Sequence, residues 1–221
     1  MKTIVALPGL HGSAALFEPL VRSCPPGFEL RVVALNPQVA AYSEHEASIT
    51  KQLPAGRFCI LAESFSGPLA VRLAAQPPVA GIILCASFVT SPRSTALRAV
   101  AKAPLFRLGP PPWLLAKFLC GGDTLLARQV AAEVRKVSPA VLAARAVETL
   151  KVNDAARLGG TRCPLLYLQA AGDWVVPARC FKDIALSRPD VELVRLDAPH
   201  LMLQTSPELA WQAMVPFLSR L

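Results

Sequence analysis

Six short apolar runs, rich in Val, Ile and Leu and with little polar alternation, recur along the chain. Strands buried on both faces of a parallel sheet have this composition, because helices cover both faces of such a sheet. Helical patterns separate most of the runs, which favours an α/β fold with right-handed crossovers. We therefore expect a six-stranded, mostly parallel sheet with helices on both faces. The runs span residues 3–7, 30–35, 58–62, 81–86, 164–169 and 191–196.

The expected helices are placed by apolar residues at helical spacing and by capping residues. The last helix begins after Ser206, a capping residue, with Pro207 at its first position. The helical patterns outside the middle of the chain cover residues 17–23, 43–53, 68–76, 178–186 and 207–221.

A long segment without a strand signal separates the fourth and fifth runs. It covers roughly 75 residues, which is too long for a loop and indicates an insertion. Pro139 should break its longest helical stretch, with Ser138 capping the second half. Helical stretches are expected at 94–102, 113–119 and 124–152.

This insertion divides the chain into two parts. We expect residues 1–90 and 161–221 to form the core, and residues 91–160 to form a helical cap. Ligands of open α/β folds bind at the carboxyl edge of the sheet, so the cap should cover that edge.

Composition excludes several classes of protein. A chain of 221 residues with 53% hydrophobic and 17% charged residues suits one globular domain rather than long disorder. No apolar stretch reaches the ~18 residues that span a bilayer, so membrane insertion is not expected. The six cysteines form no CxxC pair and have no histidine at metal-ligand spacing. We therefore expect free thiols, no metal site and a cytoplasmic location.

The strand–helix junction at Ser64 has the pattern of a nucleophile elbow. An apolar run meets Ser64 and turns at once into a helical pattern, and small residues, Ala62 and Ser66, flank it two positions away. Such a turn presents a hydroxyl at the top of a sheet and leaves no room for large neighbours. Ser64 is the candidate nucleophile, although a capping serine would look similar. Ser66 is the rival hydroxyl, but its position fits a small-residue requirement better.

Only three histidines are available as a general base. His200 follows the sixth run, so its loop emerges at the same sheet edge as Ser64. His45 lies in a polar stretch that indicates a solvated helix start. His11 lies in the loop after the first run. We therefore expect His200 to reach Ser64.

Two aspartates could orient the base. Asp173 follows the fifth run, where it could serve as the third member of a triad or cap the next helix. Asp197 is closer to His200 in sequence but more suited to shaping the histidine loop. Glu63, next to Ser64, should point away from it.

The loop at residues 8–13, PGLHGS, follows the first run. In serine hydrolases this loop supplies one backbone N–H to the oxyanion hole, and the residue after the nucleophile supplies the other. The candidates are Leu10 and Phe65. The loop lacks the GxGxxG spacing of a phosphate cradle.

These stretches resemble the α/β-hydrolase superfamily along nearly the whole chain. The resemblance implies a Ser64–His200–Asp173 triad, an oxyanion hole at the Leu10 and Phe65 N–H groups, and hydrolysis of carboxylic esters without a cofactor. It is carried by LPGLHGSAALFEPL (7–20), AESFSGPLAVRLA (62–74), ILCASF (83–88), AAGDWVVP (170–177) and LDAPHLMLQ (196–204).

The chain departs from the family pattern in two ways. Ala62 and Ser66 replace the usual glycines around the nucleophile, but both are small. The first run already leads into the oxyanion loop, so two N-terminal strands of many members are missing. The chain therefore looks like a minimal, six-stranded member with a helical cap.

The expected substrate is a small-molecule ester held under an apolar cap. Candidate substrate contacts are His11, Trp113, Trp174 and Leu201. Residues 91–160 carry eleven Lys or Arg and four Asp or Glu, a net charge of +7. That excess could be a solvated basic face, or it could steer an anionic substrate or an acidic carrier protein.

Other functions remain as alternatives. The chain is similar in size and cap placement to esterases that act on acyl groups attached to carrier protein, so thioester or carrier-linked ester hydrolysis is the first. A non-catalytic ligand binder of the same fold is the second. Nucleic-acid binding is suggested only by the basic pI and lacks a motif or interleaved aromatics.

Overall fold

The structure is a computed structural model that describes residues 1–75, 78–93 and 109–221. At its centre is a six-stranded sheet in the order β2-β1-β3-β4-β5-β6, in which every neighbouring pair is parallel. The α/β sheet expected from the sequence is thereby confirmed. The strands are β1 (Lys2–Leu7), β2 (Phe28–Val32), β3 (Phe58–Glu63), β4 (Val79–Cys85), β5 (Leu165–Gly172) and β6 (Glu192–Pro199).

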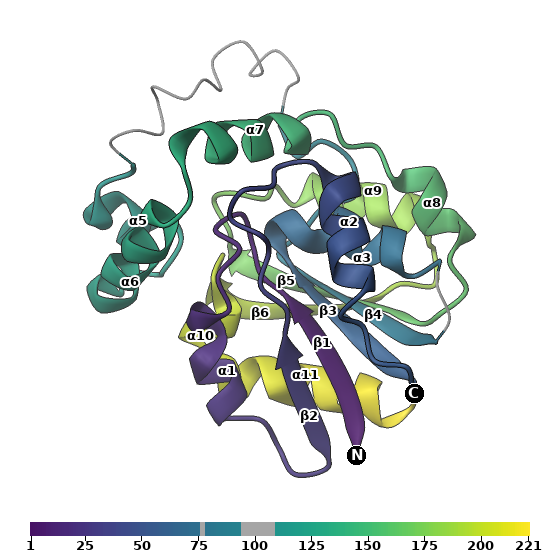
Figure 1. The fold of residues 1–221 in the computed structure, drawn as a ribbon. Helices are drawn as coiled ribbons and strands as arrows, with labels where there is room; N and C mark the ends of the chain where they lie inside the picture. The colour runs from purple at the N-terminus through teal and green to yellow at the C-terminus, as the bar shows by residue number, and fades with distance from the viewer. Residues whose placement is uncertain (76–77, 94–108) are drawn as a thin grey trace.

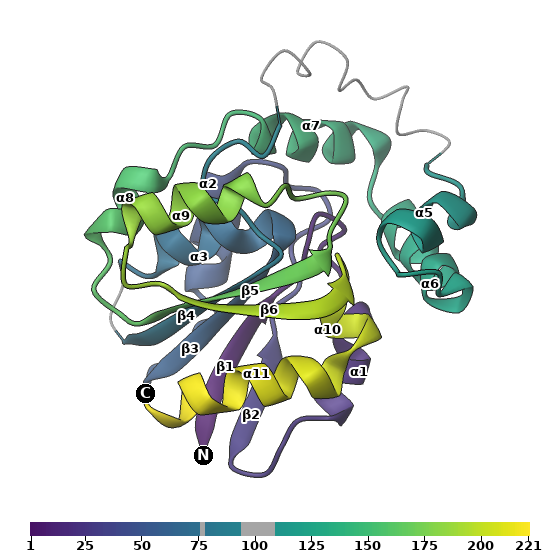
Figure 2. The same cartoon turned by 180° about the vertical axis from the view of Figure 1, so that it is seen from behind.

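Helices cover both faces of the sheet and create a hydrophobic core on each (Figures 1 and 2). Successive strand residues alternate between the two cores: Val5 and Leu7 join one, Ile4 and Ala6 the other. One face carries α2 (Tyr42–Thr50), α3 (Gly67–Leu73), α8 (Ala155–Gly160) and α9 (Arg179–Ser187). The other carries α1 (Glu18–Arg22), α10 (Met202–Thr205) and α11 (Pro207–Ser219).

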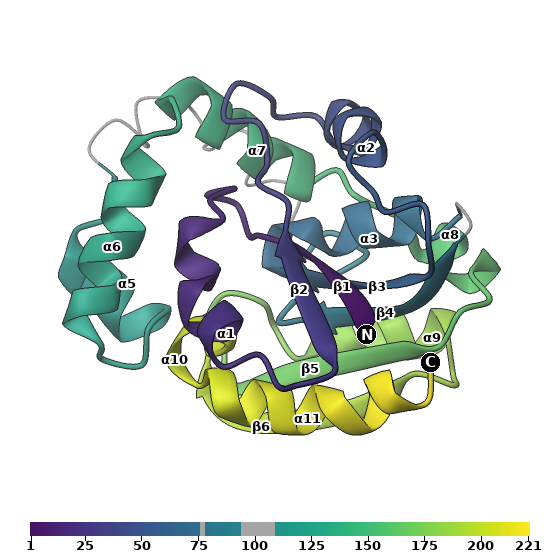
Figure 3. The same cartoon turned by 60° about the horizontal axis from the view of Figure 1, so that its bottom comes forward.

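After residue 109, the described part of the long segment between β4 and β5 contains helices joined by short turns. Among the described residues of this segment, three helices lie beyond the carboxyl ends of the strands (Figures 1 and 3). They are α5 (Pro112–Phe118), α6 (Thr124–Arg135) and α7 (Pro139–Thr149). Helix α8, which follows α7, packs its Leu158 into the core beside α3 and α9. The helical stretch expected at 94–102 lies outside the described residues.

Capping residues set the ends of the inserted helices. The Asp123 carboxylate accepts from the Leu125 and Leu126 N–H groups at the start of α6. The Ser138 hydroxyl accepts from the Val141 N–H at the start of α7, as expected from the Ser–Pro pair.

The two ends of the inserted segment are tied together beside the core. Thr90, five residues after β4, pairs with Asn153 in an isolated antiparallel bridge. The Asp154 N–H donates to the Val89 carbonyl at 2.7 Å. The segment therefore leaves and rejoins the core at one place.

Two local expectations differ from the structure. The second strand ends at Val32 rather than at residue 35, and the apolar residues beyond it, Val33 and Leu35, are buried in a loop. Ser206 stands at the start of α11, but its side chain makes no capping hydrogen bond. The short helices α8 and α10 were not expected from the sequence.

The six cysteines are all unpaired, and four of them are buried. Burial raises the pKa of the Cys120 and Cys180 thiols to about 11. In the described parts of the chain, we find no helix with the length and apolar character that crossing a bilayer requires.

Candidate active site

Ser64, His200 and Asp173 form one hydrogen-bonded chain, although they come from the ends of three different strands. The Ser64 hydroxyl lies 3.0 Å from His200 Nε2, and His200 Nδ1 lies 2.8 Å from the Asp173 carboxylate. A carboxylate only accepts, so Nδ1 carries the proton and Nε2 accepts from the serine. The exposed fraction of the histidine is 3%. The arrangement can remove a proton from Ser64 and hold the positive charge that results.

The backbone at Ser64 is strained in the way a nucleophile elbow requires. Its φ angle is +49°, one of only two positive values at non-glycine residues in the described chain. Such strain costs of order 1–3 kcal/mol and is kept where the surroundings enforce it. Here the Ser87 hydroxyl donates to the Ser64 carbonyl at 2.5 Å, and the turn leads directly into α3.

The residues around the elbow explain why small side chains are needed there. Ala62 is fully buried in β3, and the Ser66 hydroxyl donates to the Pro8 carbonyl at 2.5 Å. A Cβ atom at Gly67 would lie 2.0 Å from the Ser87 hydroxyl. Ser66, the rival nucleophile, therefore braces the first loop and does not contact His200.

Asp173 is held in place by its own loop. One carboxylate oxygen accepts from the Val175 and Val176 N–H groups, and the other faces His200. It thus combines the two alternatives that the sequence left open, a turn cap and a histidine partner. Asp197 is exposed on β6 instead.

His45 differs from the expectation of a solvated helix start. It is 1% exposed and packs edge-on against Phe65, with 6.1 Å between the ring centroids. Burial, with a further contribution from the Arg145 charge, lowers the pKa of His45 to about 4. His45 is therefore a neutral core residue and does not contact Ser64.

The loop after β1 lies beside Ser64. Within the described residues, the Leu10 N–H makes no hydrogen bond, whereas the neighbouring Gly12 N–H donates to the Gly9 carbonyl. Phe65 follows Ser64 in the first turn of the elbow, and its carbonyl accepts from the buried Tyr42 hydroxyl. The two expected oxyanion donors thus belong to segments that meet at the nucleophile.

An apolar cavity of about 360 Å³ opens onto Ser64 and His200. Helices α5, α6 and α7 all contribute to its wall, so the inserted segment covers the Ser64 hydroxyl. Of the four candidate substrate contacts, His11 and Leu201 line this cavity. Trp113 and Trp174 do not: they are 67% and 69% exposed, and Trp174 reaches the wall only through its ring contact with Phe118.

Three buried polar residues beside the site were not identified from the sequence. Glu63, expected to point away from Ser64, makes no hydrogen bond with it, but it is fully buried and lines the same cavity. It accepts from the Gly9 N–H and from the Gln204 side chain. Arg145 of α7 is fully buried and donates to the Leu10 carbonyl. For Glu63 and Arg145 the available signal was a charged residue inside an apolar pattern, and Gln204 carries no such signal.

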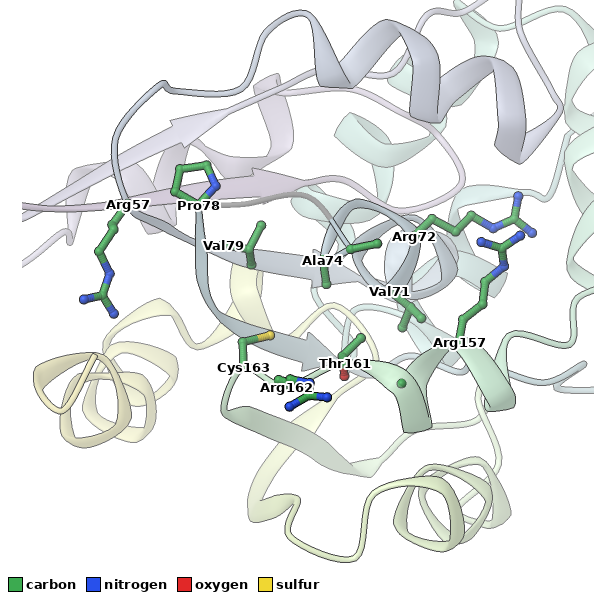
Figure 4. A pocket seen from close by; sticks show the side chains of 12 residues that line it. Arg57, Val71, Arg72, Ala74, Pro78, Val79, Arg157, Thr161, Arg162 and Cys163 are labelled. Carbon is green, nitrogen blue, oxygen red and sulfur yellow. The ribbon is translucent and has the colours of Figure 1, made fainter.

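A larger hollow of about 750 Å³ lies at the opposite edge of the sheet (Figure 4). Its wall includes four arginines, of which Arg72 and Arg157 share the carboxylate of Asp154. The hollow lies at the amino ends of β3 and β4, whereas Ser64 follows the carboxyl end of β3. It is therefore separate from the candidate active site.

No group of three or more His, Cys, Asp or Glu side chains in residues 1–75, 78–93 and 109–221 is arranged to hold a metal ion.

Comparison with known proteins identifies the family of folds. Residues 3–213 match the model of the Alpha/beta hydrolase family. A search of curated proteins finds no match.

Solved structures resemble this chain over nearly its full length. An esterase from Thermogutta terrifontis has a TM-score of 0.83 and 20% identity, covering 100% of this chain and 90% of its own. The enol-lactonase from Burkholderia xenovorans LB400 has a TM-score of 0.80 and 18% identity, covering 99% and 91%. MenH from S. aureus has a TM-score of 0.81 and 15% identity, covering 99% and 94%. At such identities, the likeness establishes the fold.

Proposed function

Because the chain belongs to the alpha/beta hydrolase family, we propose that this hydrolase cleaves carboxylic esters with Ser64 as its nucleophile. The observation that carries the proposal is the Ser64–His200–Asp173 chain, with its 3.0 and 2.8 Å contacts, at a strained elbow below an apolar cavity. An esterase and a lactonase among the similar structures are consistent with this chemistry.

The first half of the proposed reaction makes an acyl-enzyme. Ser64 attacks the ester carbonyl while His200 Nε2 takes the hydroxyl proton, and Asp173 stabilises the imidazolium that forms. The Leu10 and Phe65 N–H groups hold the oxyanion. His200 then protonates the leaving alcohol, so that the ester C–O bond breaks.

The second half returns the enzyme to its starting state. His200 takes a proton from water, which attacks the acyl-enzyme carbonyl, and the Ser64 oxygen leaves with the proton from His200. Both halves use only side chains and backbone of this chain, so the proposed reaction needs no cofactor.

The cavity favours short or medium neutral acyl groups as substrates. Its wall is apolar apart from the residues at Ser64, and includes Leu114, Phe118 and Leu142 from the inserted segment. Its volume is at the small end of the ~300–1,000 Å³ range of ligand pockets. An unpaired carboxylate on the acyl chain would lose its hydration there without a partner.

Labelling with a fluorophosphonate tests the proposal. We expect one label per molecule on Ser64, no label on Ser64→Ala, and continued labelling of Ser66→Ala, which removes the neighbouring buried hydroxyl. Hydrolysis of p-nitrophenyl esters of graded chain length should depend on the same residue. A correctly folded wild-type protein that takes up no label would refute the serine hydrolase proposal.

A second candidate substrate is an acyl group on an acidic carrier protein. The observation that favours it is the set of exposed cationic side chains on and between the inserted helices. These are Lys117, Arg128, Arg135, Lys136 and Lys151. Cationic surfaces attract acidic partners during encounter.

A further inference from the structure

The loop between β1 and α1 holds one backbone group of particular importance. The proposed oxyanion donor, the Leu10 N–H, belongs to the peptide group that joins Gly9 to Leu10. The preceding peptide group carries the Gly9 N–H, and the following one carries the Leu10 carbonyl. Two anchored neighbours would fix the direction of the peptide group between them, because each peptide unit is planar.

The preceding peptide group is held by a buried anion. The Gly9 N–H donates to the Glu63 carboxylate at 3.1 Å, and the exposed fraction of Glu63 is 0%. The other carboxylate oxygen accepts from Gln204, one turn after His200, at 2.9 Å. Burial raises the pKa of Glu63, but the opposing contributions of His11, Gln204 and His200 prevail and lower it. Both of its oxygens accept a hydrogen bond, an arrangement that suits a carboxylate.

The following peptide group is held by a buried cation. Arg145 donates to the Leu10 carbonyl at 2.7 Å, and its exposed fraction is also 0%. Its other nitrogens donate to the Asn36 and Val39 carbonyls. Desolvation lowers the pKa of Arg145, but a guanidinium stays charged at neutral pH.

Arg145 is unusual because no carboxylate in the described part of the chain pairs with it. Buried charges are normally paired, because desolvating an ion costs several kcal/mol. Three carbonyls offset part of this cost. The guanidinium also lies 5.9 Å from the ring of Phe65, the residue of the second proposed oxyanion donor.

From these contacts we propose that Glu63 and Arg145 form a charge clamp that positions the Leu10 N–H for the oxyanion. This inference rests on the proposed ester hydrolysis and deepens it. Both are positioning residues: they act through the backbone of residues 9 and 10. Since α7 carries Arg145, the inserted segment also takes part in building the oxyanion hole.

Loosening the clamp should lower kcat with little change in KM. A misplaced catalytic group can cost ~100-fold in rate, and we expect losses of about 10- to 100-fold for Arg145→Lys and Glu63→Leu. Glu63→Gln should recover most of the Glu63→Leu loss. Its amide oxygen can still accept from Gly9, and its amide nitrogen can donate to Gln204 Oε1 once the Gln204 amide, which now donates to Glu63, turns over by 180°.

Arg188→Lys provides the matched control. Arg188 is 7% exposed and donates to the Thr161 and Cys163 carbonyls, remote from Ser64, although unlike Arg145 it also pairs with a carboxylate, that of Asp190. Its replacement should lower the melting temperature without changing kcat. The comparison separates loss of a buried arginine in general from loss of the clamp.

A transition-state analogue tests the clamp directly. A trifluoromethyl ketone forms a Ser64 adduct with an oxyanion, so its Ki should rise by the factor by which kcat/KM falls in Arg145→Lys. Affinity for the corresponding secondary alcohol, which forms no oxyanion, should stay within twofold. If Glu63→Leu fails to fold, the kcat/KM and Ki values of Arg145→Lys are sufficient to test the clamp.

The outcomes separate the two proposals. If the wild type hydrolyses esters but Arg145→Lys loses stability as Arg188→Lys does, with kcat and Ki within twofold of wild type, the clamp is wrong and the function stands. If the wild type neither reacts with fluorophosphonate nor cleaves esters, the function fails and the clamp fails with it.

Discussion

Ser64 and Gly67 make opposite demands on the backbone of one short turn. The backbone of Ser64 has a left-handed conformation, which residues with a side chain rarely adopt. Gly67 has an ordinary helical conformation but no space for a side chain, because the Phe88 carbonyl would lie 2.7 Å from a Cβ atom. The turn therefore depends on glycine for close packing rather than for a special φ angle.

Gly67→Ala should be strongly destabilising. The added methyl group must displace the Ser87 hydroxyl or the Phe88 backbone, and overpacking of this kind costs about 2 kcal/mol. Because Ser87 holds the Ser64 carbonyl, the proposed esterase activity should fall as well. Urea unfolding measures the first effect. Gly56→Ala, with nothing within 4 Å of the new atom, should stay within 0.5 kcal/mol of wild type.

His45 should make the protein less stable in mild acid. Its pKa is about 4 when folded, below the ordinary 6.5 of the unfolded chain. As pH falls through 6.5, the unfolded chain binds a proton that the folded protein does not, so stability decreases towards pH 4. The stability is retained above pH 6.5, where His45 is neutral in both states. The total loss is about 3 kcal/mol.

Comparison with His45→Phe measures this contribution. The free energy of unfolding of the variant should change less between pH 7 and pH 4 than that of the wild type. Carboxyl groups whose pKa is lowered, such as Glu29 and Asp190, act below about pH 4.5 in both proteins and cancel. Parallel pH profiles for the two proteins would contradict the assignment.

At the scale of helices and strands, capping shows what a residue type alone can predict. Asp123, Ser138 and Ser206 all stand at the first position before a helix. Asp123 and Ser138 accept hydrogen bonds from the following turn, whereas the Ser206 side chain caps nothing. The backbone conformation explains the difference: Ser206 has ψ of 53°, unlike the extended values of 105° and 145° at the other two.

Asp123→Ala should destabilise α6 by about 1 kcal/mol, because two N–H groups lose their acceptor. Ser206→Ala should cost less than 0.5 kcal/mol, since no capping bond is lost. Hydrogen exchange of the first turn of each helix is the direct measurement. An equal loss of protection against hydrogen exchange in both variants would contradict the absence of a capping hydrogen bond from Ser206.

The sequence predicted strands and long helices well because their signal is local. Runs such as residues 58–62 are apolar throughout, and β3 covers them. It predicted the end of β2 poorly, because Val33 and Leu35 are apolar for burial in a loop rather than for pairing in the sheet. The residues that pair with a strand lie far away in the chain, so the sequence of a short segment does not show where its pairing ends.

The candidate site was predicted to the extent that topology fixes it. Loops that follow parallel strands meet at one edge, so Ser64, Asp173 and His200 could be placed together from their positions alone. The roles of Glu63 and Arg145 depend on which way a side chain turns after the chain folds. Arg145 on an otherwise apolar helix face looks like an ordinary surface cation in the sequence, and the structure buries it.

At the scale of the whole molecule, the positive surface charge and the apolar cavity would act at different stages of a reaction. Five cationic side chains of the inserted segment, Lys117, Arg128, Arg135, Lys136 and Lys151, are exposed, while the cavity wall, apart from the residues near Ser64, is apolar. Charge can therefore act on the approach of a substrate, and the cavity on its acyl group. Long-range attraction of this kind weakens as salt shortens the Debye length, which is about 10 Å at 0.1 M.

The salt dependence of kcat/KM should distinguish the two candidate substrates. Turnover of an ester on an acidic carrier protein should slow as salt rises from 20 to about 500 mM, because salt screens the encounter. Turnover of a small neutral ester with the same acyl group should stay nearly constant. Steady-state rates on both substrates are sufficient, and an equal response would remove carrier steering from consideration.

The bridge between Thr90 and Asn153 has a consequence for how such a molecule can diversify. The inserted segment leaves and returns at neighbouring strands, so its length is nearly independent of the sheet. Doubling a loop costs only ~0.6 kcal/mol of closure entropy. Insertions, deletions or exchange of the helices other than α7, which carries Arg145, can therefore alter the wall of the cavity while the strands that lead to Ser64, Asp173 and His200 are inherited unchanged.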